Sequence, residues 1–119
     1  MRLQHVSIAI AAGGADEGRA FYGGLLGLEE KPVPPKLDPN ELVWFHLGGD
    51  RELHLMQTGD EPPPGAHFCI AVDSGLDELR GRLEAEGIET RTPTEIVGRP
   101  RFTCHDPFGN LVELTQLPE

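Results

Sequence analysis

The feature that most constrains the fold is a six-residue pattern that occurs twice. The chain reads His-Val-Ser-Ile-Ala-Ile at residues 5–10 and His-Phe-Cys-Ile-Ala-Val at residues 67–72. In a β-strand, alternate side chains point to opposite faces. Each copy therefore has one face of bulky apolar residues and one face of small residues that begins with a histidine. We interpret the small-residue face as the floor of a binding site.

The segments that follow each copy occur in the same order. In each half, the hydrophobic pattern and the positions of glycine and proline predict a strand, a helix and three further strands. The predicted strands are 3–10, 28–33, 42–47 and 52–57 in the first half, and 66–72, 88–92, 100–104 and 111–116 in the second. A single repetition of this order fits a tandem duplication. The predicted fold class is therefore α+β, with two tandem βαβββ modules.

Each module is expected to contain one helix. The first helix is predicted between an N-cap at Asp16 and a C-terminal stop at Gly27. The second is predicted to start from a cap at Asp73 or Ser74 and to end at Gly87. Its expected buried stripe consists of three leucines, at positions 76, 79 and 83.

The length of 119 residues favours a single domain, 1–119. Within it we expect module one at 1–59, a stiff proline-rich linker at 60–65 and module two at 66–119. The net charge of -10 argues against nucleic acid or an anionic membrane as a partner. No apolar run approaches the ~20 residues of a membrane span, and no signal peptide is recognised. Two cysteines, expected as reduced thiols, agree with a cytoplasmic protein.

Four polar residues occupy the same kind of position in their predicted strands. His5, His54, His67 and Glu113 each lie in a predicted first or last strand of a module, opposite its apolar face. Each residue alone fits an ordinary hydrogen-bonded or solvated side chain. A buried, unpaired carboxylate on a concave face costs several kcal/mol, whereas three imidazoles and one carboxylate around a divalent cation satisfy one another. The set therefore predicts a metal site.

Other residues are candidates for substrate binding. Trp44 is expected to line the cleft or to cap its rim, and Met56 shares a strand face with His54. Arg101 can meet an anionic substrate or lie in a solvated loop, and Cys69 can contact substrate or simply fill space. Glu52, on the same face as His54, is a second candidate for proton transfer besides Glu113.

Two motifs resemble the vicinal oxygen chelate superfamily, which includes glyoxalase I, extradiol dioxygenases, methylmalonyl-CoA epimerase and bleomycin-binding proteins. They are Ala-Phe-Tyr at 20–22 with Gly-Leu-Leu-Gly-Leu at 24–28, and Asp-Pro-Phe-Gly-Asn-Leu-Val-Glu-Leu at 106–114. The resemblance implies curved mixed sheets around a cleft with one metal. It also implies ligands from the first and last strand of each half, here His5, His54, His67 and Glu113. In glyoxalase I the position of His54 normally carries glutamate.

The resemblance implies a metal-dependent, glyoxalase-like enzyme, a lyase or isomerase, that acts on a small molecule with vicinal oxygens. The ion, Zn, Ni, Fe, Co or Mn, would stabilise an oxyanion or enediolate as a Lewis acid. One alternative is an extradiol ring-cleaving dioxygenase, with His5 or His54, His67 and Glu113 as its facial triad. Another is a non-catalytic protein that binds a bleomycin-like drug. All of these readings predict a homodimer.

Overall fold

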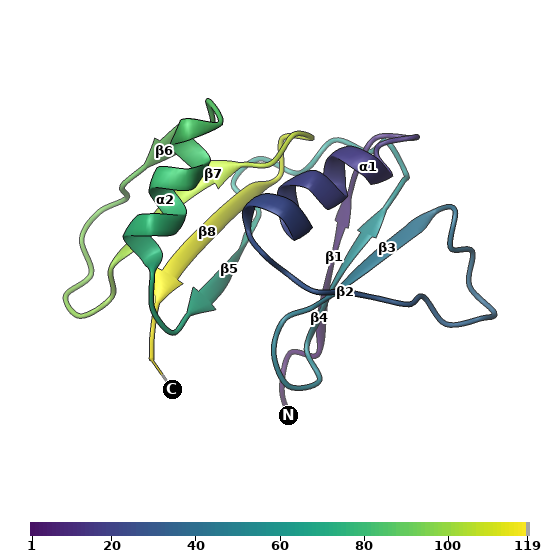
Figure 1. The fold of residues 1–119 in the computed structure, drawn as a ribbon, viewed down its shortest axis with the longest axis horizontal. Coiled ribbons are helices and arrows are strands. Elements are labelled where there is room, and N and C mark those ends of the chain that lie inside the picture. Colours follow the sequence, from purple (N-terminus) through teal and green to yellow (C-terminus); the bar gives the residue numbers. More distant parts are fainter. Residues whose placement is uncertain (119) are drawn as a thin grey trace. The chain divides into compact units, whose positions relative to one another are not determined.

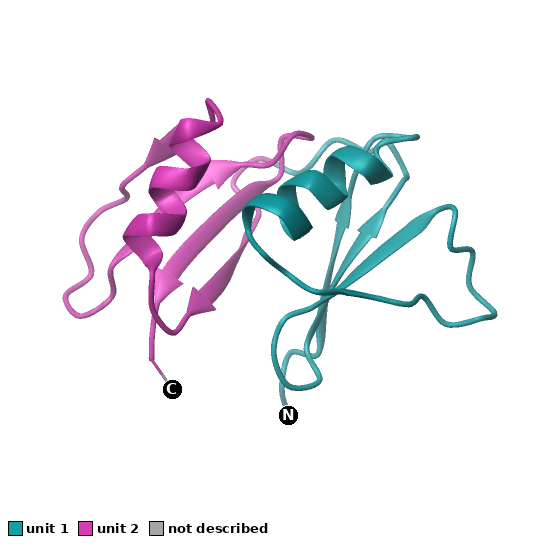
Figure 2. Ribbon diagram, viewed as in Figure 1, with its two compact units in different colours: residues 1–63 teal, residues 64–119 magenta. Residues whose placement is uncertain are grey.

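The chain divides into two compact units in the computed structural model, which describes residues 1–118 (Figure 1). The N-terminal unit is Met1–Pro63 and the C-terminal unit begins at Pro64 (Figure 2). The boundary therefore falls inside the segment 60–65 that the sequence predicts as a linker. The single-domain reading of the pair of modules stays a prediction.

The N-terminal unit is a four-stranded mixed sheet with one helical segment. Its elements are β1 (His5–Ala9), α1 (Ala15–Gly18), η1 (Arg19–Leu25), β2 (Glu30–Lys31), β3 (Leu42–His46) and β4 (Glu52–Met56). The strand order is β1-β4-β3-β2. The first strand is parallel to β4, and the other neighbours are antiparallel.

The C-terminal unit repeats this arrangement. Its elements are β5 (His67–Val72), α2 (Leu76–Ala85), β6 (Thr90–Arg91), β7 (Arg101–His105) and β8 (Leu111–Gln116). The strand order is β5-β8-β7-β6, again with a parallel first pair. Two units with the order strand, helix and three strands confirm the predicted α+β class and the βαβββ duplication.

Strand alternation explains why the core of each unit lies on one face of its sheet. On one face of each sheet the apolar side chains are buried, namely Val43, Phe45, Leu53 and Leu55 in β3 and β4, and Phe102, Cys104, Val112 and Leu114 in β7 and β8. The helical segment contacts β3 in the N-terminal unit, and α2 contacts β6 and β8 in the C-terminal unit (Figure 1). The predicted stripe of Leu76, Leu79 and Leu83 is confirmed as buried. The opposite face of each sheet is left for polar side chains.

The first helix differs from the prediction in its winding. Its second half, η1, is a π-helix, with a bond from the Leu26 N–H to the Phe21 carbonyl at 2.9 Å. A side chain at Gly23 would lie 3.4 Å from the ring of Phe45, so the helix packs closely on the sheet there. The predicted end at Gly27 is confirmed by its positive φ of 76°.

The predicted helix caps are wrong. The N-cap of α1 is Gly14, not Asp16, and it makes no side-chain cap bond. The N-cap of α2 is Gly75, at φ 81°, rather than Asp73 or Ser74. The reason at α2 is tertiary, because Oε1 of Gln116 in β8 accepts the Leu76 N–H at 3.2 Å. A side chain from another element thus replaces the local cap.

The short strands β2 and β6 are the other difference. The sequence predicts 28–33 and 88–92, whereas the ladders contain only Glu30–Lys31 and Thr90–Arg91. Each is an edge strand, and its flanking residues pair with no neighbour on the outer side.

Among the described residues, no helix is long and apolar enough to cross a membrane.

Candidate functional site

The polar face of the N-terminal sheet is organised as cross-strand rungs. Lys31, Trp44, His54 and Ser7 occupy one rung, on β2, β3, β4 and β1. Paired residues on adjacent strands share a face and have Cβ atoms about 5 Å apart. Glu52 is opposite His5 in the neighbouring rung. The fold therefore brings His5, His54 and Glu52 together, as the alternation in the sequence predicts.

Three rings stack on this face. The His54 imidazole lies parallel to Trp44, with centroids 3.7 Å apart and an interplanar angle of 6°. His5 stacks on His54 at 4.3 Å and 19°. The indole Nε1 of Trp44 is buried and has no hydrogen-bond partner within the described chain. The stack fixes the plane of the His54 ring.

Glu52 is held by two neighbours. Its Oε2 accepts from the Lys31 ammonium, and its Oε1 lies 3.0 Å from Nε2 of His54. These hydrogen bonds, that from Lys31 first, lower the pKa of Glu52 to about 2. Glu52 is therefore an anion at neutral pH and accepts the Nε2–H of His54. Burial is the largest cause of the lowered pKa of His54, and the nearby charge of His5 acts in the same direction.

The polar face of the C-terminal sheet centres on Glu113, which is buried. Its Oε1 lies 3.5 Å from Nε2 of His67 and 3.3 Å from Nη1 of Arg101. Its Oε2 accepts from the thiol of Cys69 at 3.5 Å, across the β5–β8 ladder. The structure thus brings His67, Glu113, Arg101 and Cys69 together.

The thiol of Cys69 is weakly reactive in this environment. Partial burial is the largest cause that raises the pKa of its thiol to about 11, and the negative charge of Glu113 adds to it. The positive charges of Arg99 and Arg101 oppose the increase. At neutral pH the residue is a neutral thiol that donates a hydrogen bond, not a nucleophile.

The hydrogen bonds indicate which ring nitrogen of each histidine keeps a free lone pair. Nδ1 of His5 lies 2.8 Å from Oε1 of Gln4, and Nδ1 of His67 lies 3.0 Å from the Gly65 carbonyl. Because both partners are acceptors, these Nδ1 atoms donate and the Nε2 atoms are free. In His54 the Nε2–H is given to Glu52, so Nδ1 carries the lone pair. Metal-binding histidines commonly donate their other ring N–H to a carboxylate or carbonyl in this way.

The spacing of the His67–Glu113 pair is compatible with two ligands of one divalent metal. Two ligands of one ion at ~2.1 Å lie about 3.0–3.4 Å apart, close to the 3.5 Å between His67 Nε2 and Glu113 Oε1. His5 and His54 occupy the corresponding positions of β1 and β4 in the other unit. Within residues 1–118 no group of three or more His, Cys, Asp or Glu side chains is arranged to hold a metal. The predicted set of four ligands therefore stays a prediction.

The remaining predicted residues occupy the same faces. Met56 ends β4 and is exposed, two residues beyond His54. Trp44 contacts His54 directly, and Arg101 contacts Glu113. Sequence reasoning missed Lys31 and Gln4, which anchor Glu52 and His5. Lys31 lies in a two-residue strand, so alternation could not predict on which face of the sheet its side chain lies.

Comparison with known proteins identifies the family. The profile of the Glyoxalase/Bleomycin resistance protein/Dioxygenase superfamily matches residues 2–114, and the chain belongs to this superfamily. The mitochondrial methylmalonyl-CoA epimerase of Bos taurus is 30% identical over 135 residues, which cover 97% of this chain and 74% of the relative.

Solved structures agree with this assignment. A protein assigned to the glyoxalase family from Bacillus anthracis has a TM-score of 0.87 and 33% identity, over 98% of this chain and 94% of that one. Lactoylglutathione lyase from Agrobacterium tumefaciens has a TM-score of 0.72 and 24% identity, over 97% and 92%. The latter likeness concerns the fold alone.

Proposed function

We propose that the protein is a metal-dependent lyase or isomerase that moves a proton next to a carbonyl group of a small substrate with vicinal oxygens. The observation that supports this most is the His67–Glu113 pair at 3.5 Å, with His5 and His54 at the corresponding positions of the other unit. The similarity to an epimerase supports proton transfer at carbon as the reaction.

The metal would be held by His5, His54, His67 and Glu113. The free lone pairs suggest Nε2 of His5 and His67 and Nδ1 of His54 as the nitrogen donors. Nitrogen and oxygen donors of this kind suit Zn, Ni, Fe, Co or Mn. When bound, the ion would supply a Lewis acid for the two substrate oxygens.

Glu113 is the better candidate for the proton carrier. Its carboxylate would take the proton from the carbon beside the carbonyl, the electron pair would move to the carbonyl oxygen, and the proton would then return to carbon or oxygen. Glu52 is a poor base, because its pKa is about 2 and Lys31 already holds it. We assign Glu52 a positioning role, since it fixes the tautomer of His54.

The other candidates would shape the substrate site. Trp44 and Met56 would offer apolar surface beside His54, whereas Cys69 and Arg101 would contact polar groups beside Glu113. We further propose a homodimer in the cytoplasm. The two free thiols support a reducing compartment.

Solvent proton exchange tests the reaction. The metal-loaded protein would be incubated in D₂O with a panel of 2-oxo acids, acyl thioesters and thiohemiacetals, and deuterium at the carbon beside the carbonyl followed by NMR. We expect the wild type to exchange and Glu113→Gln to lose exchange completely. Glu52→Gln should only reduce exchange, and it should also bind metal more weakly, which is the separate sign that Glu52 has a positioning role. Oxygen consumption with catechols, in the absence of exchange, would identify a dioxygenase instead. Tight binding of a drug without either reaction would identify a binding protein.

A further inference from the structure

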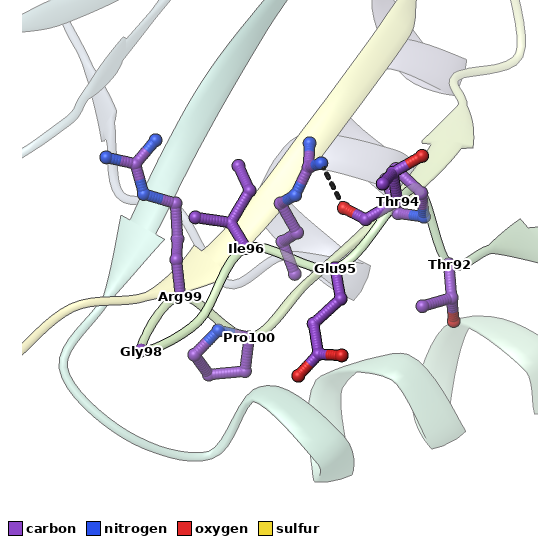
Figure 3. A pocket seen from close by; sticks show the side chains of 9 residues that line it. Thr92, Thr94, Glu95, Ile96, Gly98, Arg99 and Pro100 are labelled. Atoms are coloured by element: carbon purple, nitrogen blue, oxygen red, sulfur yellow. Dashed lines mark hydrogen bonds between the residues drawn. The ribbon is translucent and has the colours of Figure 1, made fainter.

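The loop before β7 lines a partly open cavity of about 260 Å³ within the C-terminal unit (Figure 3). Its lining comes entirely from residues 92–101, including Thr94, Ile96, Arg99 and Arg101. Pockets for drug-sized ligands usually measure roughly 300–1,000 Å³. The cavity is therefore of a size to accept one end of a substrate rather than a whole large ligand.

Arg99 supplies a cation to this cavity that the chain leaves unpaired. Its side chain is exposed and makes no hydrogen bond or ion pair within the described chain. Two other exposed arginines are paired, Arg2 with Asp50 and Arg19 with Glu30. The cavity also contains an acid, Glu95, but Figure 3 shows the Arg99 and Glu95 side chains leaving the loop in opposite directions.

Arg101 supplies a second, fixed cation. Its Nη2 donates to the Thr94 carbonyl at 2.6 Å and its Nη1 to Glu113 at 3.3 Å. Its Nε is buried and has no partner among residues 1–118. A buried donor without a partner is unfavourable, so an oxygen acceptor at this place would stabilise the site.

The cavity adjoins the proposed proton carrier. Arg101 both lines it and contacts Glu113, and the charges of Arg99 and Arg101 both reach Cys69, which donates to Glu113. A group bound in the cavity is thus separated from Glu113 by a single side chain. A small substrate can span this separation.

We propose that the 92–101 loop is an anion subsite in which Arg99 and Arg101 bind a carboxylate or phosphate group of the substrate. Guanidinium groups match the geometry of both anions and form charge-assisted hydrogen bonds with them. The inference rests on the proposed function in one respect, since it takes the anion to be part of the molecule whose proton is moved. The substrate class is then a small carbonyl compound with an anionic group a few bonds from the reacting carbon.

NMR of the arginine side chains tests the subsite on its own. The ¹⁵N-labelled, metal-free full-length protein would be titrated with inorganic phosphate and, separately, acetate at constant ionic strength, and the Nε–Hε signals followed. We expect saturable shifts of Arg99 and Arg101. The anion that binds more tightly distinguishes phosphate from carboxylate as the preferred group.

Two variants with the same loss of charge provide the comparison. Arg99→Gln, at an exposed position, should weaken binding about tenfold, and Arg99→Lys should recover part of it. Arg91→Gln, an exposed change in β6 outside the cavity, should bind as the wild type does. Absence of saturable shifts, or equal binding by wild type and Arg99→Gln, would overturn the proposal. Anion binding by a protein that takes up no metal would keep the subsite and reject the proposed reaction.

Discussion

At the scale of single residues, the hydrogen bonds of Glu52 predict how the stability of the folded state depends on pH. Because Lys31 and His54 lower the pKa of Glu52 from 4.5 to about 2, the folded state binds its proton less readily than the unfolded state does. The resulting stability is fully present above about pH 4.5 and is lost as the pH falls towards 2. Lys31→Met should therefore cost about 1–2 kcal/mol at pH 7 and much less at pH 2.

Urea unfolding of wild type and Lys31→Met between pH 2 and 7 measures this difference. Lys36→Met, in the exposed loop before β3, removes the same charge without touching Glu52 and is the control. A loss of stability that is the same at every pH, or equal in the control, would show that Lys31 does not act through Glu52.

Cys69 should react slowly although it is exposed. With a thiol pKa of about 11, the reactive thiolate is scarce at pH 8, and alkylation by iodoacetamide should be about 100-fold slower than for a free cysteine. Glu113→Gln removes one cause of the raised pKa and should speed the reaction severalfold. Site-resolved mass spectrometry separates Cys69 from Cys104, and alkylation of Cys69 at the rate of free cysteine would contradict the assignment.

Alternation along the strands is why the candidate residues could be predicted. His54 and Glu113 had to oppose the apolar residues on either side of them, and both lie on the polar face of their sheets. The partners of these residues could not be predicted, because they depend on contacts across strands. Lys31 reaches Glu52 from β2, and Gln116 replaces a helix cap from β8.

At the scale of the element, two glycines near each other in the chain should respond oppositely to alanine. Gly75 has a φ of 81°, which a side chain strains, so Gly75→Ala should destabilise the unit by about 1 kcal/mol. Gly81 lies inside α2 with open space around it, so Gly81→Ala should stabilise by about 0.5–1 kcal/mol. Thermal unfolding of the two variants checks both signs, and a shift in the same direction for both would contradict the structure of α2.

Element order was predictable because the hydrophobic pattern changes its period between strands and helices. The π-helix η1 was not, since the spacing of apolar residues does not distinguish its winding from that of an α-helix. The lengths of β2 and β6 also depend on how far the neighbouring strands extend. Local sequence therefore specified which elements form, and packing decided their ends and winding.

At the scale of the whole molecule, duplication gives the two units equivalent strand positions that carry different residues. The pair His5–His54 corresponds to His67–Glu113, so the C-terminal pair contains a carboxylate and the N-terminal pair does not. The carboxylates on the two polar faces also have different partners, because Glu52 accepts from Lys31 and Glu113 accepts from Arg101. The two units therefore present different donor groups at equivalent positions.

Metal content of the purified protein is the most direct test of the proposed site. After exposure to Zn, Ni, Fe, Co and Mn in turn and removal of free ions, the wild type should retain about one ion per chain by mass spectrometry. His67→Ala should retain almost none, whereas His105→Ala, at the exposed end of β7, should match the wild type. Full metal content in His67→Ala, or no retained ion in the wild type, would contradict the claim that His5, His54, His67 and Glu113 bind one metal.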